Sequence, residues 1–308
     1  MPDPIFICGP TASGKSALAI QFALRLCGEI ISVDSMQVYR GMDLGTAKPT
    51  AAERALAPHH LVDILELEEA FDAAKFVEFA RRAEAGITER GRRPIYCGGT
   101  GFYFKALLEG VGNAPPGNPV LRGEIEKIPL SMLLAELEQT DPVTFSRIDR
   151  QNPRRVVRAI EVIRLTGKPF SAQQAAWKVK TDPNGQPASR PLLFGLRRSD
   201  TDLRERIAHR VNTMFEGGLV AETERLMGLG LSTNPTAMQA IGYRQVIEHL
   251  RGERSFADTI SLVKTKTWQF ARRQMTWFRR QLPVRWIEIP AGEIGDDVIA
   301  EVTRQANE

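Results

Sequence analysis

Short apolar runs alternate with helix-spaced apolar positions through the N-terminal third of the chain. The runs at 4–8, 29–33 and 93–97 have the length and composition of buried β-strands. Between them, apolar side chains recur every three or four residues at 15–26 and 72–90, which predicts two helices. Strands that alternate with helices in this way favour an α/β fold with a parallel sheet and right-handed crossovers.

Two runs rich in proline, glycine and asparagine, at 112–119 and 182–191, interrupt this alternation. Between them the pattern is helical throughout, and strand patterns return at 192–196 and 285–289. We therefore expect a helical domain inserted into an α/β core. The chain would divide into a core segment at 1–112, the helical insertion at 113–190, and the remainder of the core with C-terminal helices at 191–308.

The composition is that of a globular protein, with 43% hydrophobic and 25% charged residues among 308. The three cysteines are widely spaced and form no CxxC pair, which argues against a disulfide scaffold or a cysteine zinc site and favours a reducing compartment. No stretch reaches the roughly 18 uncharged apolar residues of a membrane span, and residues 1–4 do not resemble a signal peptide. We expect a cytoplasmic protein without a membrane partner.

The charge is distributed unevenly, although 41 Lys and Arg against 37 Asp and Glu leave a net charge of only +4. Residues 142–170 hold seven basic and two acidic residues, and residues 259–287 hold seven basic residues and no acidic one. These blocks carry +5 and +7, so the rest of the chain carries −8. Clustered Lys and Arg are typical of surfaces that bind nucleic acid. The alternative is that both blocks are ordinary solvated helix faces.

The second block has the spacing of one helix with two different sides. At 100° per residue, one sector of about 120° collects the basic side chains of Lys266, Arg272, Arg273, Arg279 and Arg280. The other side collects Val263, Phe270, Ala271, Met275, Trp277 and Phe278. We expect the apolar side to dock on the core and the basic side to face outward, with the nearby Trp268, Trp277 and Trp286 packing in the core rather than stacking on bases.

Residues 9–16, Gly-Pro-Thr-Ala-Ser-Gly-Lys-Ser, match the pattern GxxxxGK[ST] between a predicted strand and a predicted helix. In such a loop, backbone N–H groups surround a phosphate chain at the helix N-terminus. Lys15 would supply a charge to the outer phosphate oxygens, and the Ser16 hydroxyl would ligate Mg²⁺. We predict a P-loop NTPase-like core with a diphosphate site formed by Gly9, Thr11, Ala12, Ser13, Gly14, Lys15 and Ser16.

The strand at 93–97 lacks the acidic residue that nucleotide hydrolases of this class use to hold Mg²⁺. It continues into Gly98, Gly99 and Thr100, and the chain has no Asn-Lys-x-Asp guanine-reading motif. A GTPase switch or an ATP-driven motor is therefore disfavoured.

Asp34 follows the strand at 29–33 directly and opens the polar segment 34–49. Because the carboxyl ends of parallel strands line the ligand crevice of open α/β sheets, Asp34 is expected to face the same cleft as Lys15. A carboxylate in this position also serves as a turn or helix cap, and position alone leaves both readings open.

Six segments together resemble the bacterial tRNA dimethylallyltransferases. They are Gly-Pro-Thr-Ala-Ser-Gly-Lys-Ser at 9–16, Asp-Ser-Met-Gln-Val-Tyr-Arg-Gly-Met-Asp-Leu-Gly-Thr-Ala-Lys-Pro at 34–49, Gly-Gly-Thr-Gly-Phe-Tyr-Phe-Lys-Ala-Leu at 98–107, Arg-Val-Val-Arg-Ala-Ile-Glu-Val at 155–162, Ile-Gly-Tyr-Arg-Gln at 241–245 and Arg-Gln-Met-Thr-Trp-Phe-Arg at 273–279. The resemblance runs in colinear order from residue 5 to about residue 287.

The resemblance implies transfer of a dimethylallyl group from dimethylallyl diphosphate to the exocyclic N6 amine of the adenosine 3′ to the anticodon. Asp34 would be the catalytic base, while Lys15, Mg²⁺ and the loop amides would stabilise the leaving diphosphate. Thr100 would lie near the bridging phosphate oxygen, although a helix N-cap explains it equally well. Arg206 and Arg210, one helical turn apart, would add guanidinium contacts to the diphosphate.

The same resemblance implies binding to the anticodon stem-loop of tRNA, and we expect the protein to be a monomer. The adenosine must leave its stack to reach Asp34, so Ser35, Met36 and Gln37 would line its channel, with Gln37 reading an adenine edge. The family commonly has Gln where this chain has Arg154, which favours a phosphate contact over base reading there. The expected tRNA contacts are Asp34, Ser35, Met36, Gln37, Thr100, Arg122, Arg154, Arg155, Arg158, Arg244, Arg272, Arg273 and Arg279.

Three other functions share part of this pattern. A small-molecule kinase would use the phosphate loop but needs neither basic block. An adenylate isopentenyltransferase would use free nucleotide, which the basic blocks and the long C-terminal part disfavour. A nucleotide-gated RNA-binding module would not need Asp34 positioned for base chemistry.

Overall fold

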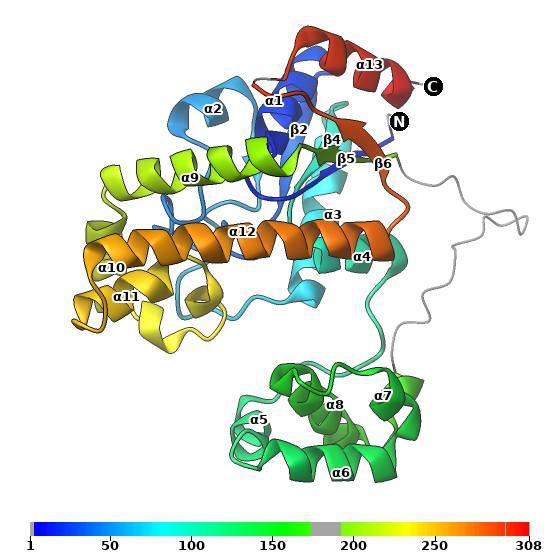
Figure 1. The fold of residues 1–308 in the computed structure, drawn as a ribbon. Helices are drawn as coiled ribbons and strands as arrows, with labels where there is room; N and C mark the ends of the chain where they lie inside the picture. The colour runs from blue at the N-terminus through cyan, green and yellow to red at the C-terminus, as the bar shows by residue number, and fades with distance from the viewer. Residues whose placement is uncertain (1–2, 174–191, 293, 308) are drawn as a thin grey trace, which may run out of the picture. The chain divides into compact units, whose positions relative to one another are not determined.

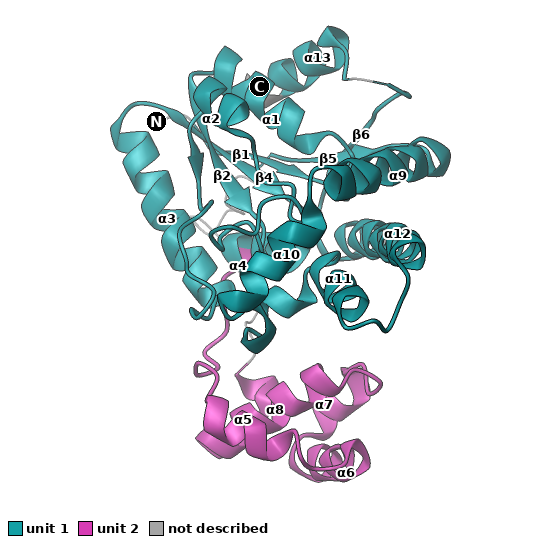
Figure 2. Cartoon of the chain, turned by 90° about the vertical axis from the view of Figure 1, so that its left-hand side faces the viewer, with its two compact units in different colours: residues 1–108, 189–308 teal, residues 109–188 magenta. Residues whose placement is uncertain are grey.

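The computed structural model describes residues 3–173, 192–292 and 294–307 and divides the chain into two compact units. Unit 1 comprises residues 1–108 and 189–308, and unit 2 comprises residues 109–188, so unit 2 corresponds to the insertion expected at 113–190 (Figure 2). None of the described helices is both long and apolar enough to cross a membrane.

Unit 1 is built on a six-stranded sheet in the order β3-β2-β4-β1-β5-β6, in which every described pairing is parallel (Figure 1). The strands are β1 (Ile5–Cys8), β2 (Gly28–Val33), β3 (His59–His60), β4 (Arg93–Gly98), β5 (Leu193–Arg197) and β6 (Arg285–Glu288). The five apolar runs of the sequence are therefore strands, and β3 is an additional one. Because β2, β4 and β1 are neighbours, the segments that follow their carboxyl ends share one edge of the sheet.

Alternate side chains of the strands pack on opposite faces of the sheet. On β1, Ile5 and Ile7 belong to the core under α1 (Lys15–Arg25) and α13 (Asp296–Asn307). Phe6 and Cys8 face a larger core on the other side. The helices of that side are α3 (Ala73–Glu89), α4 (Gly101–Glu109), α9 (Asp200–Glu216), α10 (Leu219–Gly228), α11 (Tyr243–Leu250) and α12 (Phe256–Gln281). The short α2 (Ala51–Leu56) and the 3₁₀ turns η2 (Leu231–Thr233) and η3 (Ala237–Gln239) complete unit 1.

The long helix α12 has the two sides that its sequence predicts, with one exception. Its basic side chains at 266, 272, 273, 279 and 280 are exposed, while Val263, Ala271 and Phe278 are buried. Trp277 packs partly buried against the larger core, as do the other two tryptophans of the region. Phe270, predicted on the docked side, is instead 38% exposed, because the buried stripe passes along the neighbouring Ala271.

Unit 2 is helical throughout its described part and has its own small core. Its helices are α5 (Pro119–Ile125), α6 (Leu130–Thr140), α7 (Pro142–Arg147) and α8 (Pro153–Thr166), followed by the 3₁₀ turn η1 (Phe170–Ala172). Proline occupies the first turn of α5, α7 and α8, where its missing N–H costs no helical hydrogen bond. Apolar side chains of α5, α6 and α8 form the core, among them Ile125, Leu133, Leu137, Val156 and Ile160.

Candidate active site

Three loops that carry predicted site residues meet at one edge of the sheet. They follow β1 (9–14), β2 (34–37) and β4 (99–100), the three adjacent strands. The Thr100 N–H donates to the Val33 carbonyl at 3.2 Å, which ties the β4 loop to the end of β2. The Asp34 carboxylate accepts from the backbone N–H groups of Met36 at 2.8 Å and Gln37 at 3.3 Å, so its own turn fixes its position.

The loop at 9–14 has the backbone expected of a phosphate site. Gly9, Ala12 and Gly14 have φ of +154°, +64° and +97°, and α1 begins immediately afterwards at Lys15. Glycine adopts such angles without strain, whereas Ala12 is held in a conformation that L-residues rarely adopt. The N-terminus of α1 therefore opens onto the loop, where its free N–H groups attract an anion.

Two cations lie at this helix terminus without a carboxylate within ion-pairing distance among the described residues. The half-buried Lys15 ammonium donates to the Pro10 carbonyl at 3.2 Å. Burial lowers the pKa of Lys15 and the Arg210 guanidinium lowers it further, while the Asp34 charge opposes both effects. Burial likewise lowers the pKa of Arg210, again against the attraction of Asp34. An anion placed between Lys15 and Arg210 therefore stabilises the charged form of both side chains.

A pocket of about 470 Å³ lies over this terminus, between the loop and α9. Its lining includes Lys15 and Ser16 from α1 and Glu205, Arg206, His209 and Arg210 from α9. Arg206, expected on the diphosphate, donates instead from Nε to the Ala12 carbonyl at 3.0 Å and from Nη1 to the Gly292 carbonyl at 3.3 Å. Arg206 therefore braces the loop, and Arg210 is the α9 guanidinium that stays available to a ligand.

Arg198 supports the phosphate loop from its buried side and was not singled out from the sequence. Its Nε donates to the Ser13 carbonyl at 2.8 Å, and its Nη1 donates to the Asp202 carboxylate at 2.8 Å and the Pro290 carbonyl at 2.9 Å. The buried Ser13 hydroxyl and Arg198 Nη2 lack hydrogen-bond partners in the described structure.

Gln37, expected to read an adenine edge, uses its amide to hold its own loop. Its Oε1 accepts from the Ser32 hydroxyl at 2.8 Å, and its Nε2 donates to the Thr46 and Ala47 carbonyls at 3.3 and 3.2 Å. Ser35 and Met36 are half-buried beside it. Gln37 therefore connects the Asp34 turn to the far end of the segment 34–49.

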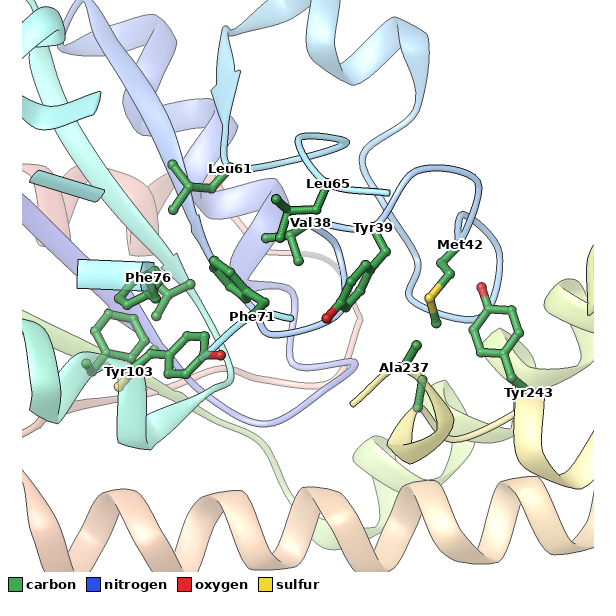
Figure 3. Close-up of a cluster of buried hydrophobic side chains, with 14 of the residues drawn as sticks. Val38, Tyr39, Met42, Leu61, Leu65, Phe71, Phe76, Tyr103, Ala237 and Tyr243 are labelled. Carbon is green, nitrogen blue, oxygen red and sulfur yellow. The ribbon is translucent and has the colours of Figure 1, made fainter. Parts of the chain in front are cut away.

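That far end is fixed in turn by two residues of the C-terminal part. The Glu222 carboxylate of α10 accepts from the Leu44 N–H at 3.1 and 3.0 Å. The Tyr243 hydroxyl of α11 donates to Glu222 Oε1 at 2.6 Å and accepts from the Gly45 N–H at 3.2 Å. Figure 3 shows Tyr243 beside Met42 in the buried cluster that carries this segment. The motif at 241–245 indicated Tyr243, but no local pattern indicated its partner Glu222.

The basic residues of unit 2 fall into two groups. Arg122 and Arg158 donate to the fully buried Glu161 carboxylate at 2.6 and 2.7 Å, and these bonds hold the pKa of Glu161 down against the effect of its burial. Arg154 and Arg155 are exposed and, with Arg147 and Arg158, line a pocket of about 570 Å³ between α7 and α8. The first pair thus has a structural role, and the second is available to a ligand.

The predicted basic residues of unit 1 are on its surface. Arg272, Arg273 and Arg279 project from the exposed side of α12, and Arg244 on α11 pairs with Glu248 at 3.2 Å. These positions suit contacts with a polyanion.

The protein oxygens at this site suit a Mg²⁺ ion that is held mainly by the phosphates of a bound substrate. The exposed Ser16 hydroxyl lies at the start of α1, and the described residues contain no cluster of three His, Cys, Asp or Glu side chains able to hold a metal alone. Mg²⁺ commonly keeps several waters and binds through substrate phosphates and one or two protein oxygens, and Ser16 would be one of these oxygens.

A parallel α/β core with a glycine-containing loop between β1 and α1, a carboxylate after β2 and no acid directly after β4 defines a P-loop-like α/β protein. Comparison with known proteins narrows this class. A family described as IPP transferase matches residues 37–281, and one described as isopentenyl transferase matches residues 4–62. The chain belongs to the tRNA dimethylallyltransferase family.

Individual relatives agree with this assignment over most of their length. The chain is 44% identical to tRNA dimethylallyltransferase 1 of Trichlorobacter lovleyi, covering 94% of both chains. It is similar to the crystal structure of the tRNA isopentenylpyrophosphate transferase of Bacillus halodurans, with a TM-score of 0.72, 35% identity and coverage of 100% and 96%. It also resembles a eukaryotic dimethylallyltransferase acting on tRNA, with a TM-score of 0.78, 26% identity and coverage of 99% and 78%.

Proposed function

We propose that this protein transfers a dimethylallyl group from dimethylallyl diphosphate to the N6 amine of the adenosine 3′ to the anticodon of tRNA. One observation carries the proposal: Lys15 and Arg210 line one pocket at the N-terminus of α1, and the charge of Asp34 acts on both cations, so a base lies near the anion site. The family of the chain supports the substrates.

The exocyclic amine of adenine is a weak nucleophile because its lone pair is delocalised into the ring. Asp34 accepts its proton as the new N–C bond forms and the C–O bond to the diphosphate breaks. Lys15, Arg210 and the N–H groups at the start of α1 bind the departing diphosphate and stabilise its growing charge. Mg²⁺, when bound, adds charge stabilisation at the same oxygens.

The two basic surfaces bind the RNA backbone. Guanidinium groups are offered by the exposed side of α12 in unit 1 and by the arginine-lined pocket of unit 2, and Arg158 excepted, none of them has a buried carboxylate partner among the described residues. Their phosphate contacts hold the stem-loop while the reacting adenosine leaves its stack. A kinase or a free-nucleotide prenyltransferase would need neither surface.

Asp34→Asn tests the base because it separates two roles of the side chain. The amide oxygen still accepts from the Met36 and Gln37 N–H groups, so the turn is kept, but the proton acceptor is lost. We expect kcat to fall on the order of 100-fold while tRNA affinity stays within several-fold. Full turnover in this variant would remove Asp34 from the chemistry.

The basic side of α12 is tested by the salt dependence of tRNA binding. Arg272→Ala with Arg273→Ala is expected to weaken binding and to lower the slope of log K against log salt by about 1–2. The matched control is Arg25→Ala with Arg304→Ala on α1 and α13, which cover the other face of the sheet and pair with Asp296 and Glu301. An unchanged slope in the α12 variant would show that it makes no phosphate contact.

A further inference from the structure

Besides Thr259 in its first turn, the buried stripe of α12 contains a second polar side chain, Gln274. It is 8% exposed and lies on the side of the helix that carries Ala271 and Phe278, directly after the exposed Arg272 and Arg273. Burial of a primary amide is unfavourable unless its oxygen and its nitrogen both find partners. The position of Gln274 therefore needs an explanation in its contacts.

Both ends of the Gln274 amide bind backbone groups of the active-site loops. Its Oε1 accepts from the Thr11 N–H of the phosphate loop at 2.9 Å, and its Nε2 donates to the Gly99 carbonyl at 2.9 Å. These loops follow β1 and β4, whereas Gln274 lies 263 residues after Thr11 and 175 residues after Gly99 in the chain. The Thr11 N–H, which was expected to bind diphosphate, therefore donates to Gln274 instead.

The β4 loop has the backbone needed for this close approach. A Cβ at Gly99 would lie 2.3 Å from Gln274 Nε2, and a Cβ at Gly101 would lie 2.2 Å from the Trp277 ring, one turn further along α12. Thr100, between these glycines, is thereby set directly against the helix.

We propose that Gln274 is a positioning residue that fixes the phosphate loop relative to the Gly99–Thr100 turn. Its amide bridges the two loops and holds both against one helix. Glutamine alone among the uncharged side chains of this length both donates and accepts at its tip. The predicted change in kcat rests on the proposed function, whereas the predicted change in diphosphate affinity does not.

Gln274→Met removes both hydrogen bonds and keeps the length of the side chain. We expect the affinity for inorganic diphosphate, measured by calorimetry, and kcat for dimethylallyl transfer each to fall on the order of 10-fold, since two buried bonds to the loops are lost. The tRNA affinity is expected to stay within twofold. Gln139→Met, at an exposed glutamine of α6 that lines neither pocket, is the control and is expected to change none of these values.

Gln274→Glu gives a readout that a general loss of stability would not produce. The ionised carboxylate still accepts from the Thr11 N–H but opposes the Gly99 carbonyl, whereas the protonated acid restores the donor. Burial and the carbonyl raise the pKa of the introduced carboxyl above the usual value of about 4.3. The ratio of variant to wild-type kcat is therefore expected to rise as the pH falls from 8 toward 5.5, while Gln139→Glu gives a constant ratio.

The outcomes separate this inference from the proposed function. Unchanged diphosphate affinity in Gln274→Met, or a ratio independent of pH in Gln274→Glu, would overturn the role of Gln274. Absence of dimethylallyl transfer by the wild-type protein would overturn the proposed function, and the calorimetric comparison would still decide the positioning role.

Discussion

Tyr243→Phe tests whether the C-terminal helices hold the segment that carries Asp34. The substitution keeps the buried ring and removes the hydroxyl that donates to Glu222 at 2.6 Å and accepts from the Gly45 N–H at 3.2 Å. Burial and the Glu222 carboxylate raise the pKa of Tyr243, so the hydroxyl stays protonated and donates over the whole working pH range. Glu222 keeps its bonds to the Leu44 N–H.

The expected cost follows from the two bonds that are lost. A hydrogen bond to a charged group contributes about 1.5–3 kcal/mol, and the unpaired Gly45 N–H adds about 1 kcal/mol. Together the two losses cost about 2.5–4 kcal/mol, so at about 2–4 °C per kcal/mol Tm is expected to fall by about 5–16 °C. Because Gln37 binds the carbonyls that follow Gly45, the Asp34 turn loosens as well, and we expect kcat to fall about 10-fold, equivalent to about 1.4 kcal/mol.

Tyr96→Phe is the matched control. The Tyr96 hydroxyl also donates to a carboxylate, that of Glu84 at 2.9 Å, but on the side of α3 and away from the segment 34–49. Differential scanning calorimetry and steady-state kinetics on both variants are expected to show similar losses of Tm but a loss of kcat in Tyr243→Phe alone, with diphosphate affinity unchanged in both. Equal losses of kcat, or none in Tyr243→Phe, would refute the reasoning.

Two further predictions concern single charges. The folded pKa of Glu161 lies below its usual value because of its two arginine partners, so its contribution to stability is present above about pH 4.5 and is lost as the pH falls through the folded pKa. Hydrogen exchange in α8 is expected to accelerate through that acid range in the wild type, and Glu161→Gln is expected to accelerate it already at pH 7 and to flatten the pH dependence. Burial lowers the pKa of Lys15, so Lys15→Met removes a cation that is unfavourable without a bound anion. This variant is expected to raise Tm by about 2–4 °C without ligand and to abolish the stabilisation by diphosphate. A lower Tm in thermal unfolding would contradict this.

The local parts of the architecture could be predicted from the sequence. The strands at 4–8, 29–33 and 93–97 are short runs made mainly of apolar residues, which is the pattern of a sheet buried on both faces. The phosphate loop is contiguous, so its residues, glycine spacing and helix all appear in one segment. The two-residue β3 is too short to produce any periodicity.

The contacts between distant segments could not be predicted. Three polar side chains show this: Gln274, Tyr243 and Glu222. Their partners lie about 175 to 263 residues away in the chain or on another helix. No local pattern in the sequence identifies a polar residue as buried. Arg206 was assigned a wrong contact by local spacing. Its separation of one helical turn from Arg210 indicated a shared ligand, whereas in the structure its guanidinium donates to the Ala12 carbonyl of the folded loop. Helical spacing alone also assigned Phe270 to the wrong side of α12.

The most direct test of the central claim offers labelled dimethylallyl diphosphate to the protein with unmodified tRNA, AMP or ATP. The predicted result is label on the N6 amine of one adenosine next to the anticodon, with one diphosphate released per group transferred and no label on AMP. Label on AMP alone, or phosphate released from ATP without transfer, would contradict it.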